Sequence, residues 1–113
     1  MDAEKQLYDI LNSKDIPAYH LNSFLDVDVV PEQFFIFNNL RTTNLRADDK
    51  IVIESLLYKI YFYSSSPVGL RGQVKSKIKQ LEEAGFICGS IYDIGKIDRK
   101  FGVEFTAHKL QKF

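Results

Sequence analysis

The side chains that could perform chemistry are few, and they lie far apart in the sequence. His20 and His108 are the only histidines and Cys88 is the only cysteine, so no local spacing predicts a metal site or a thiol nucleophile. The Ser-x-x-Lys sequence from Ser76 to Lys79 lacks the companion motifs of acyl enzymes. No Gly-x-Gly-x-x-Gly or Walker sequence is present. We therefore expect a protein that is not an enzyme and that uses no metal and no cofactor.

Charged residues point instead to contacts with a partner. Residues 1–56 carry ten acidic and five basic side chains, a net charge of −5, and residues 57–113 carry the reverse. Either these charges simply face solvent, or an acidic face of one copy meets a basic face of the next. Lys75 and Lys79 share the outer face of a predicted helix, which is either solvated or docks an acidic neighbour or DNA phosphates. The balanced total argues against a dedicated nucleic-acid-binding protein.

Length and composition are those of one globular domain, residues 1–113. The longest apolar run is shorter than the roughly 18–20 residues of a membrane helix, and the beginning, MDAEKQLYD, lacks the apolar segment of a signal peptide. One cysteine cannot form an internal disulfide. We therefore expect no membrane partner and an intracellular folding compartment.

The first half of the chain alternates apolar and polar segments. Apolar residues recur at helical spacing before Pro17, which ends the predicted helix. FFIF, Phe34–Phe37, is apolar on both faces and predicts a central strand, whereas the polar run that follows is too long for a hairpin turn. The expected elements are a helix at Asp2–Ser13, a strand at Ala18–Leu21, a loop or edge segment at Asn22–Gln33, the central strand, and a mobile polar connector at Asn38–Asp49.

From Lys50 to Ser64 the sequence contains no Gly, Pro, Asn or Asp, which predicts one uninterrupted strand. A straight strand of this length would span about 50 Å, whereas a domain of this size has a radius of gyration of about 13 Å. The strand must therefore bend or leave the globule. Because Ile53 and Tyr58 belong to apolar sets on different faces, a β-bulge is expected near Ser55 to Leu57.

The last third of the chain predicts a helix and two strands. Ser66 and Pro67 are typical of a helix start, an apolar stripe from Leu70 to Ala84 follows, and Gly85 suits a left-handed C-terminal position. The expected elements are then a strand at Phe86–Tyr92, a turn at Asp93–Lys100, a strand at Lys100–His108, and a tail at 109–113 that is loose or bound to a partner.

This order of elements predicts an α+β fold. We expect a mostly antiparallel sheet of four to five strands, two helices packed on one face, and a long protruding hairpin.

Five segments of the sequence resemble the small tail-terminator and head–tail joining proteins of long-tailed bacteriophages. They are LYDILNSKDIPAYHLNSF, PEQFFIFNN, LRADDKIVIESLLYKIYFYSSS, KIKQLEEAGFICGS and FGVEFTAHK. In that family an N-terminal helix leads into a strand like IP-x-A-Y-x-x-F. A polar loop ending in A-D-[DN]-K then precedes a long strand rich in Tyr and Ile. The resemblance covers roughly Leu7 to His108.

The resemblance implies a structural virion protein that forms a ring, with a hexamer favoured. The ring would cap the tail tube and join it to the capsid connector, in the tail or neck of a virion assembled in the host cytoplasm. Its partners would be the tail tube protein and the head connector or neck proteins, with DNA passing through the lumen without specific binding. The contacts would involve Arg41, Asn44, Arg46, Asp48, Asp49, Lys59, Tyr61, Tyr63, Lys75 and Lys79. The alternatives are a head-completion adaptor of the phage neck and a monomeric protein-binding module.

Overall fold

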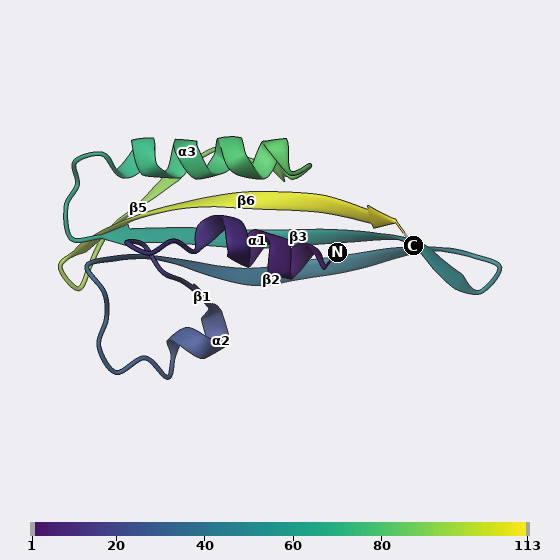
Figure 1. Cartoon of the computed structure of the whole chain (residues 1–113), viewed down its shortest axis with the longest axis horizontal. Helices are drawn as coiled ribbons and strands as arrows, with labels where there is room; N and C mark the ends of the chain where they lie inside the picture. Colours follow the sequence, from purple (N-terminus) through teal and green to yellow (C-terminus); the bar gives the residue numbers. More distant parts are fainter. Residues whose placement is uncertain (1, 113) are drawn as a thin grey trace.

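The protein, described here over residues 2–112 of a computed structural model, has an α+β fold with a mixed six-stranded sheet (Figure 1). Strands β1-β2-β3-β6-β4 are adjacent in that order, and β5 also pairs with β6. Within residues 2–112, β1 and β2 are the only strands that pair in parallel. The elements are α1 (Ala3–Leu11), β1 (Ala18–His20), α2 (Leu21–Phe24), β2 (Gln33–Ala47), β3 (Lys50–Ser64), α3 (Leu70–Glu83), β4 (Ile87–Cys88), β5 (Tyr92–Ile97) and β6 (Lys100–Lys112).

The core lies between one face of the sheet and helices α1 and α3, as the sequence predicted. We call this the helix face. Alternate residues of β3, among them Tyr58, Ile60 and Phe62, point into it and are almost fully buried. Leu7 of α1 and Leu81 of α3 close it from the other side. The opposite face, which we call the open face, is covered only in part, by the short helix α2, which was not expected.

The boundaries of α3 correct one prediction and confirm another. Ser66 and Pro67 do not begin the helix, which starts at Leu70. They belong to a turn before it, in which the Ser66 hydroxyl accepts a hydrogen bond from the Val68 backbone N–H at 3.3 Å. Gly69, with φ 77°, occupies the N-cap position instead. Gly85 follows the helix with φ 95°, in the left-handed region predicted for it.

The prediction of a polar connector at Asn38–Asp49 is wrong. Strand β2 continues to Ala47 and pairs with β3 through almost every residue, leaving a turn of only Asp48 and Asp49. Both turn residues have positive φ, 52° and 62°, as type I′ hairpin turns require. Polar residues are tolerated here because backbone hydrogen bonds, and not side-chain burial, hold this part of the ladder together. The mobility expected of this segment stays a prediction.

The fifteen-residue strand β3 is confirmed, but the bulge is not where it was expected. The register of β3 with β6 is unbroken from Ile53 to Ser64. The irregularities are in the pairing with β2, at Leu40 and at Val52, which have no partner across the ladder. The strand leaves the globule, because the hairpin extends past the end of β6 (Figure 1) and the molecule is 52 Å long.

The strands after α3 also differ from the prediction. The strand expected at Phe86–Tyr92 is reduced to Ile87–Cys88, and the expected turn at Asp93–Lys100 forms most of β5 before a two-residue turn at Asp98 and Arg99. β6 continues to Lys112, so this part of the expected loose tail is strand; Phe113 lies outside the described residues. None of the helices within residues 2–112 is long and apolar enough to cross a membrane.

Candidate interaction surfaces

The residues considered for chemistry remain dispersed in the fold. Burial raises the pKa of the Cys88 thiol to about 11, so it is protonated at neutral pH. His20 accepts a hydrogen bond from the Asn22 backbone N–H at 3.2 Å. Ser55 Oγ lies 2.5 Å from His108 Nε2 across β3 and β6, a pair that the sequence did not reveal. In the described chain, no carboxylate hydrogen-bonds to the His108 ring to complete a catalytic triad, and no group of His, Cys, Asp and Glu could hold a metal.

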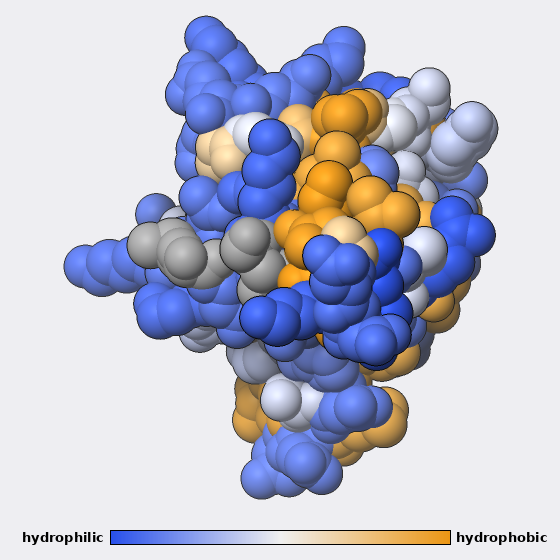
Figure 2. Space-filling model, turned by 90° about the vertical axis from the view of Figure 1, so that its right-hand side faces the viewer, coloured by the Kyte–Doolittle hydropathy of each residue, from blue (hydrophilic) through white to orange (hydrophobic). Residues whose placement is uncertain are grey.

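The first candidate surface is the outer part of the β2–β3 hairpin, residues 40–54, which we call the arm. Every residue from Leu40 to Lys50 is exposed. Leu40 and Leu45 are about half exposed, and so is Leu110 of β6, which pairs with Ser55 beside the arm. Figure 2 looks at this end of the molecule and shows apolar side chains gathered in a band between hydrophilic ones. The arm therefore presents both apolar and charged groups to its surroundings.

The structure brings together five of the predicted contact residues on the arm. Arg41, Asn44 and Arg46 lie along β2, and Asp48 and Asp49 form the turn at its end. All five are exposed. Among the ion pairs of residues 2–112, none involves any of these side chains.

The second surface is the open face, which carries the predicted residues Lys59, Tyr61 and Tyr63. Lys59 forms an ion pair with Glu104 of β6 at 3.3 Å. Tyr63 stacks on Phe34 with ring centroids 5.4 Å apart, and burial raises the pKa of its hydroxyl. The face also contains aromatic residues that the prediction omitted.

Those omitted residues form a hollow of about 280 Å³ at the end of the sheet away from the arm. Phe24 of α2 stacks on Phe34 at 4.9 Å, and Ile97 and Asp98 reach the same hollow from the β5–β6 turn. The phenylalanines of β2 could have indicated this hollow. The prediction treated both faces of Phe34–Phe37 as core, so it did not show that the face with Phe34 is only partly covered.

The third surface is the outer side of α3, where Lys75 and Lys79 are exposed. Figure 1 shows α3 beside the main part of the sheet and the arm extending beyond it. The predicted contact residues therefore lie on three surfaces and do not form a single site.

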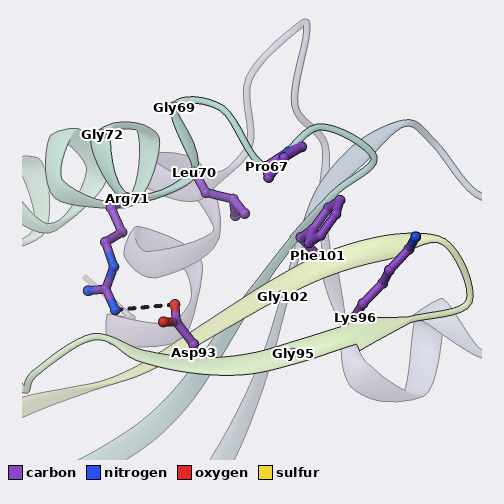
Figure 3. A pocket seen from close by; sticks show the side chains of 10 residues that line it. All are labelled: Pro67, Gly69, Leu70, Arg71, Gly72, Asp93, Gly95, Lys96, Phe101 and Gly102. Atoms are coloured by element: carbon purple, nitrogen blue, oxygen red, sulfur yellow. Dashed lines mark ion pairs between the residues drawn. The ribbon is translucent and has the colours of Figure 1, made fainter.

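A second hollow, of about 550 Å³, lies between the beginning of α3 and β5 (Figure 3). Arg71 of α3 crosses toward β5 and pairs with Asp93 at 3.2 Å. Lys96 lies over the Phe101 ring, 5.4 Å from its centroid. The sequence did not predict this hollow, because β5 was expected to be a turn.

No protein-family model matches this chain, and no curated protein matches it. The proposal about function therefore rests on the surfaces described above, and mainly on the arm.

Proposed function

We propose that this protein is a structural virion protein of the tail-terminator or head–tail joining type. In this role it forms a ring with copies of itself, caps the phage tail tube, and joins the tube to the capsid connector. The observation that carries the proposal is the arm, a hairpin that extends outside the protein's own core and exposes every residue of β2 from Leu40 to Ala47.

The arm is built in a way that suits a partner. A two-stranded hairpin alone is marginally stable in water, because it buries little apolar surface. The arm nevertheless is paired along its length, apart from Leu40 and Val52, and ends in a two-residue turn. It exposes leucine side chains next to arginine and aspartate, a mixture of apolar and hydrogen-bonding groups that is typical of protein interfaces. Contact with a second protein would cover these groups.

The sequence resemblance supports the particular assembly. In tail terminators the expected partners are other copies of the same chain, with a hexamer favoured, the tail tube protein on one side, and neck proteins on the other. DNA would pass through the lumen of such a ring without specific binding. The zero net charge of the chain agrees with that passive role.

The test combines native mass spectrometry with a head–tail joining assay in a lysate that lacks this protein. We expect a closed oligomer, free or assembled on tails, and restored joining with the wild-type chain. Arg46→Glu should abolish joining without lowering the melting temperature, because Arg46 is exposed on the arm. Lys14→Glu, an equally exposed change of the same charge outside the arm, is the matched control.

Wild-type joining by Arg46→Glu would show that the arm is not the interface. A monomer at every concentration that also fails to bind heads or tails would overturn the virion role and favour the monomeric binding module. Binding to heads alone would favour a head-completion adaptor.

A further inference from the structure

The segment between α2 and β2, residues 25–32, exposes apolar and acidic side chains together, and we call it the acidic loop. Leu25 and Val29 are 76% and 81% exposed, more than all but one other large apolar side chain of the described residues. Asp26 and Asp28 alternate with the apolar side chains and are also exposed. Among the ion pairs of residues 2–112, none involves either carboxylate. The fold therefore leaves both the apolar and the charged groups of this loop available to a partner.

The acidic loop is held at both ends on the open face of the sheet. Before it, Phe24 stacks on Phe34, and Val30 lines the open-face hollow. At its end, the Ser65 backbone N–H donates a hydrogen bond to the Glu32 carbonyl at 3.0 Å. Helix α3 lies on the other side of the sheet (Figure 1). The loop therefore cannot reach the surface around α3 of its own chain, although it can reach that of another copy.

The hollow between α3 and β5, which we call the α3–β5 hollow, has an apolar wall and free space. Pro67, Leu70 and Phe101 line it (Figure 3). Val68, next to Pro67, is 85% exposed, the highest value for a large apolar side chain of residues 2–112. A Cβ atom added at Gly72 would meet no atom within 4 Å. The hollow can therefore accept apolar side chains from outside.

The charges of the two surfaces are opposite when every charged residue of each segment is counted. From Asp15 to Leu40 the sequence contains four acidic residues and no Lys or Arg. Residues 65–81, with the beginning of α3, contain four bases and no acid. Residues 92–102 contain three bases and two acids. The charged residues around the hollow are Arg71, Lys75, Lys77, Lys79, Asp93, Lys96, Asp98, Arg99 and Lys100.

The remaining charges nearby do not cancel this difference. Asp98 and Lys100 line the open-face hollow beside Val30, so the acidic loop has one charge of each sign next to it in its own chain. Glu82 and Glu83 lie at the opposite end of α3, about 18 Å along the helix from its beginning. The surroundings of the α3–β5 hollow therefore stay basic, and those of the loop stay acidic.

One cation at the hollow is available for an acidic partner. Asp93 pairs with Arg71 at 3.2 Å, whereas Lys96 lies over the Phe101 ring and takes part in none of the ion pairs of residues 2–112. Burial of apolar side chains in the hollow would contribute affinity. Opposite charges at its rim would orient the loop and exclude wrong partners.

We infer that the acidic loop of one copy of this protein docks in the α3–β5 hollow of the next copy. Leu25 and Val29 contact the apolar wall, and Asp26 and Asp28 face Lys96. The inference rests on the proposed function in that both require self-association. Because the two surfaces differ, the contact is heterologous, and repeating it produces a closed ring or a filament. The arm takes no part in this contact and stays free for tail tube or neck proteins.

Filling the hollow tests the contact without disturbing the core. Gly72 is an exposed residue of α3 without positive φ, and glutamine is a good helix former, so Gly72→Gln should not lower the melting temperature. It should weaken self-association about tenfold or more, as should Asp28→Lys on the loop. Ser76→Gln, at an exposed position further along α3, and Asp15→Lys, at an exposed aspartate outside the loop, are the controls. Native mass spectrometry over a range of concentrations measures all four.

Mixing the two weakened variants tests the heterologous geometry. Gly72→Gln keeps a working loop and Asp28→Lys keeps a working hollow, so together they should form a one-to-one heterodimer that does not grow further. Absence of this heterodimer would overturn the inference, and so would wild-type assembly by Gly72→Gln alone. If Gly72→Gln self-associates normally but no longer binds heads or tails, the hollow docks a different protein, and the inference is wrong.

Zero-length cross-linking detects the contact even when association is weak. A carbodiimide joins a carboxylate and a lysine amine that touch into an amide, and itself takes up the water that is lost. In a mixture of nitrogen-15-labelled and unlabelled protein, we expect links between chains from Asp26 or Asp28 to Lys75 or Lys96. Gly72→Gln should reduce these links about tenfold or more. Links between chains that involve only other residues would contradict the docking.

The outcomes separate this inference from the proposed function. Rings without the loop–hollow link would refute the docking and leave the ring-forming role standing. The link in a protein that does not restore head–tail joining would support the docking and refute the virion role. Neither oligomer nor link, with or without heads and tails, would refute both.

Discussion

The two halves of the β2–β3 hairpin share one ladder but differ in what holds them in place. In the inner half, Phe34–Phe37 of β2 are all buried, and Phe35 packs on Phe62 of β3 with ring centroids 4.6 Å apart. In the arm, every residue of β2 from Leu40 onward is exposed. Helices α1 and α3 cover only the inner half, so burial stabilises that half while backbone hydrogen bonds and the turn hold the arm.

The largest difference is expected between apolar truncations in the two halves. Phe62→Ala should lower the free energy of unfolding by about 3–5 kcal/mol, because it leaves a cavity at a fully buried site. Leu45→Ala in the arm should change it by no more than about 0.5 kcal/mol. Urea unfolding of the monomer measures both, and similar losses would mean that the arm packs as tightly as the core.

A close backbone approach in the inner sheet is expected to produce the next largest effect. A Cβ atom at Gly102 would lie 2.8 Å from side-chain atoms of Ile94 and Tyr63. Gly102→Ala should therefore destabilise the protein by about 1–3 kcal/mol. A Cβ atom at Gly72 in α3 would have no neighbouring atom within 4 Å, so Gly72→Ala should be neutral or stabilising by up to about 1 kcal/mol. Urea unfolding of the two variants therefore separates the cost of steric overlap at Gly102 from the effect of replacing a glycine.

The turn of the arm is expected to produce a smaller, local effect. Asp49 has φ 62°, a conformation that costs glycine little, so Asp49→Gly should stabilise the arm by about 1 kcal/mol or less. Hydrogen exchange should slow at the amides of residues 41–54 and stay unchanged at the inner strands. Asp28→Gly, at a position without positive φ, should leave exchange in the arm unaltered. Slowing throughout the sheet would mean that arm and core open together.

A pH-dependent effect is expected from the titration of Cys88, in the body of the protein. Burial raises the pKa of its thiol from 9.0 to about 11, so the folded state holds this proton more tightly than the unfolded state does. The resulting stability is complete below pH 9 and is lost as the pH rises to about 11. Under reducing conditions, Cys88→Ala should lose less stability than the wild type between pH 8 and 11. Parallel curves would contradict the shift.

The sequence predicted elements best where local pattern and tertiary environment agree. Strict alternation from Phe101 to Ala107 predicted an amphipathic strand, and Val103, Phe105 and Ala107 are buried as expected. The sequence could assign the predicted contact residues to helices and strands, but it could not show which of them lie on the same surface. The pattern did not indicate that Asp93 would face α3, because that depends on how β5 pairs with β6.

The sequence by itself determined the long strand β3, the apolar stripe of α3 and the left-handed Gly85, because breaker residues, helical spacing and glycine act locally. The tertiary structure alone decided that β2 would continue to Ala47 and that Tyr92–Ile97 would be a strand. Neither pattern was strong enough to predict a strand from the sequence. Each segment becomes a strand because its backbone pairs with a long neighbouring strand, β2 with β3 and β5 with β6. The open edges left by those two pairings are also a product of the fold, since they exist only where the sheet ends.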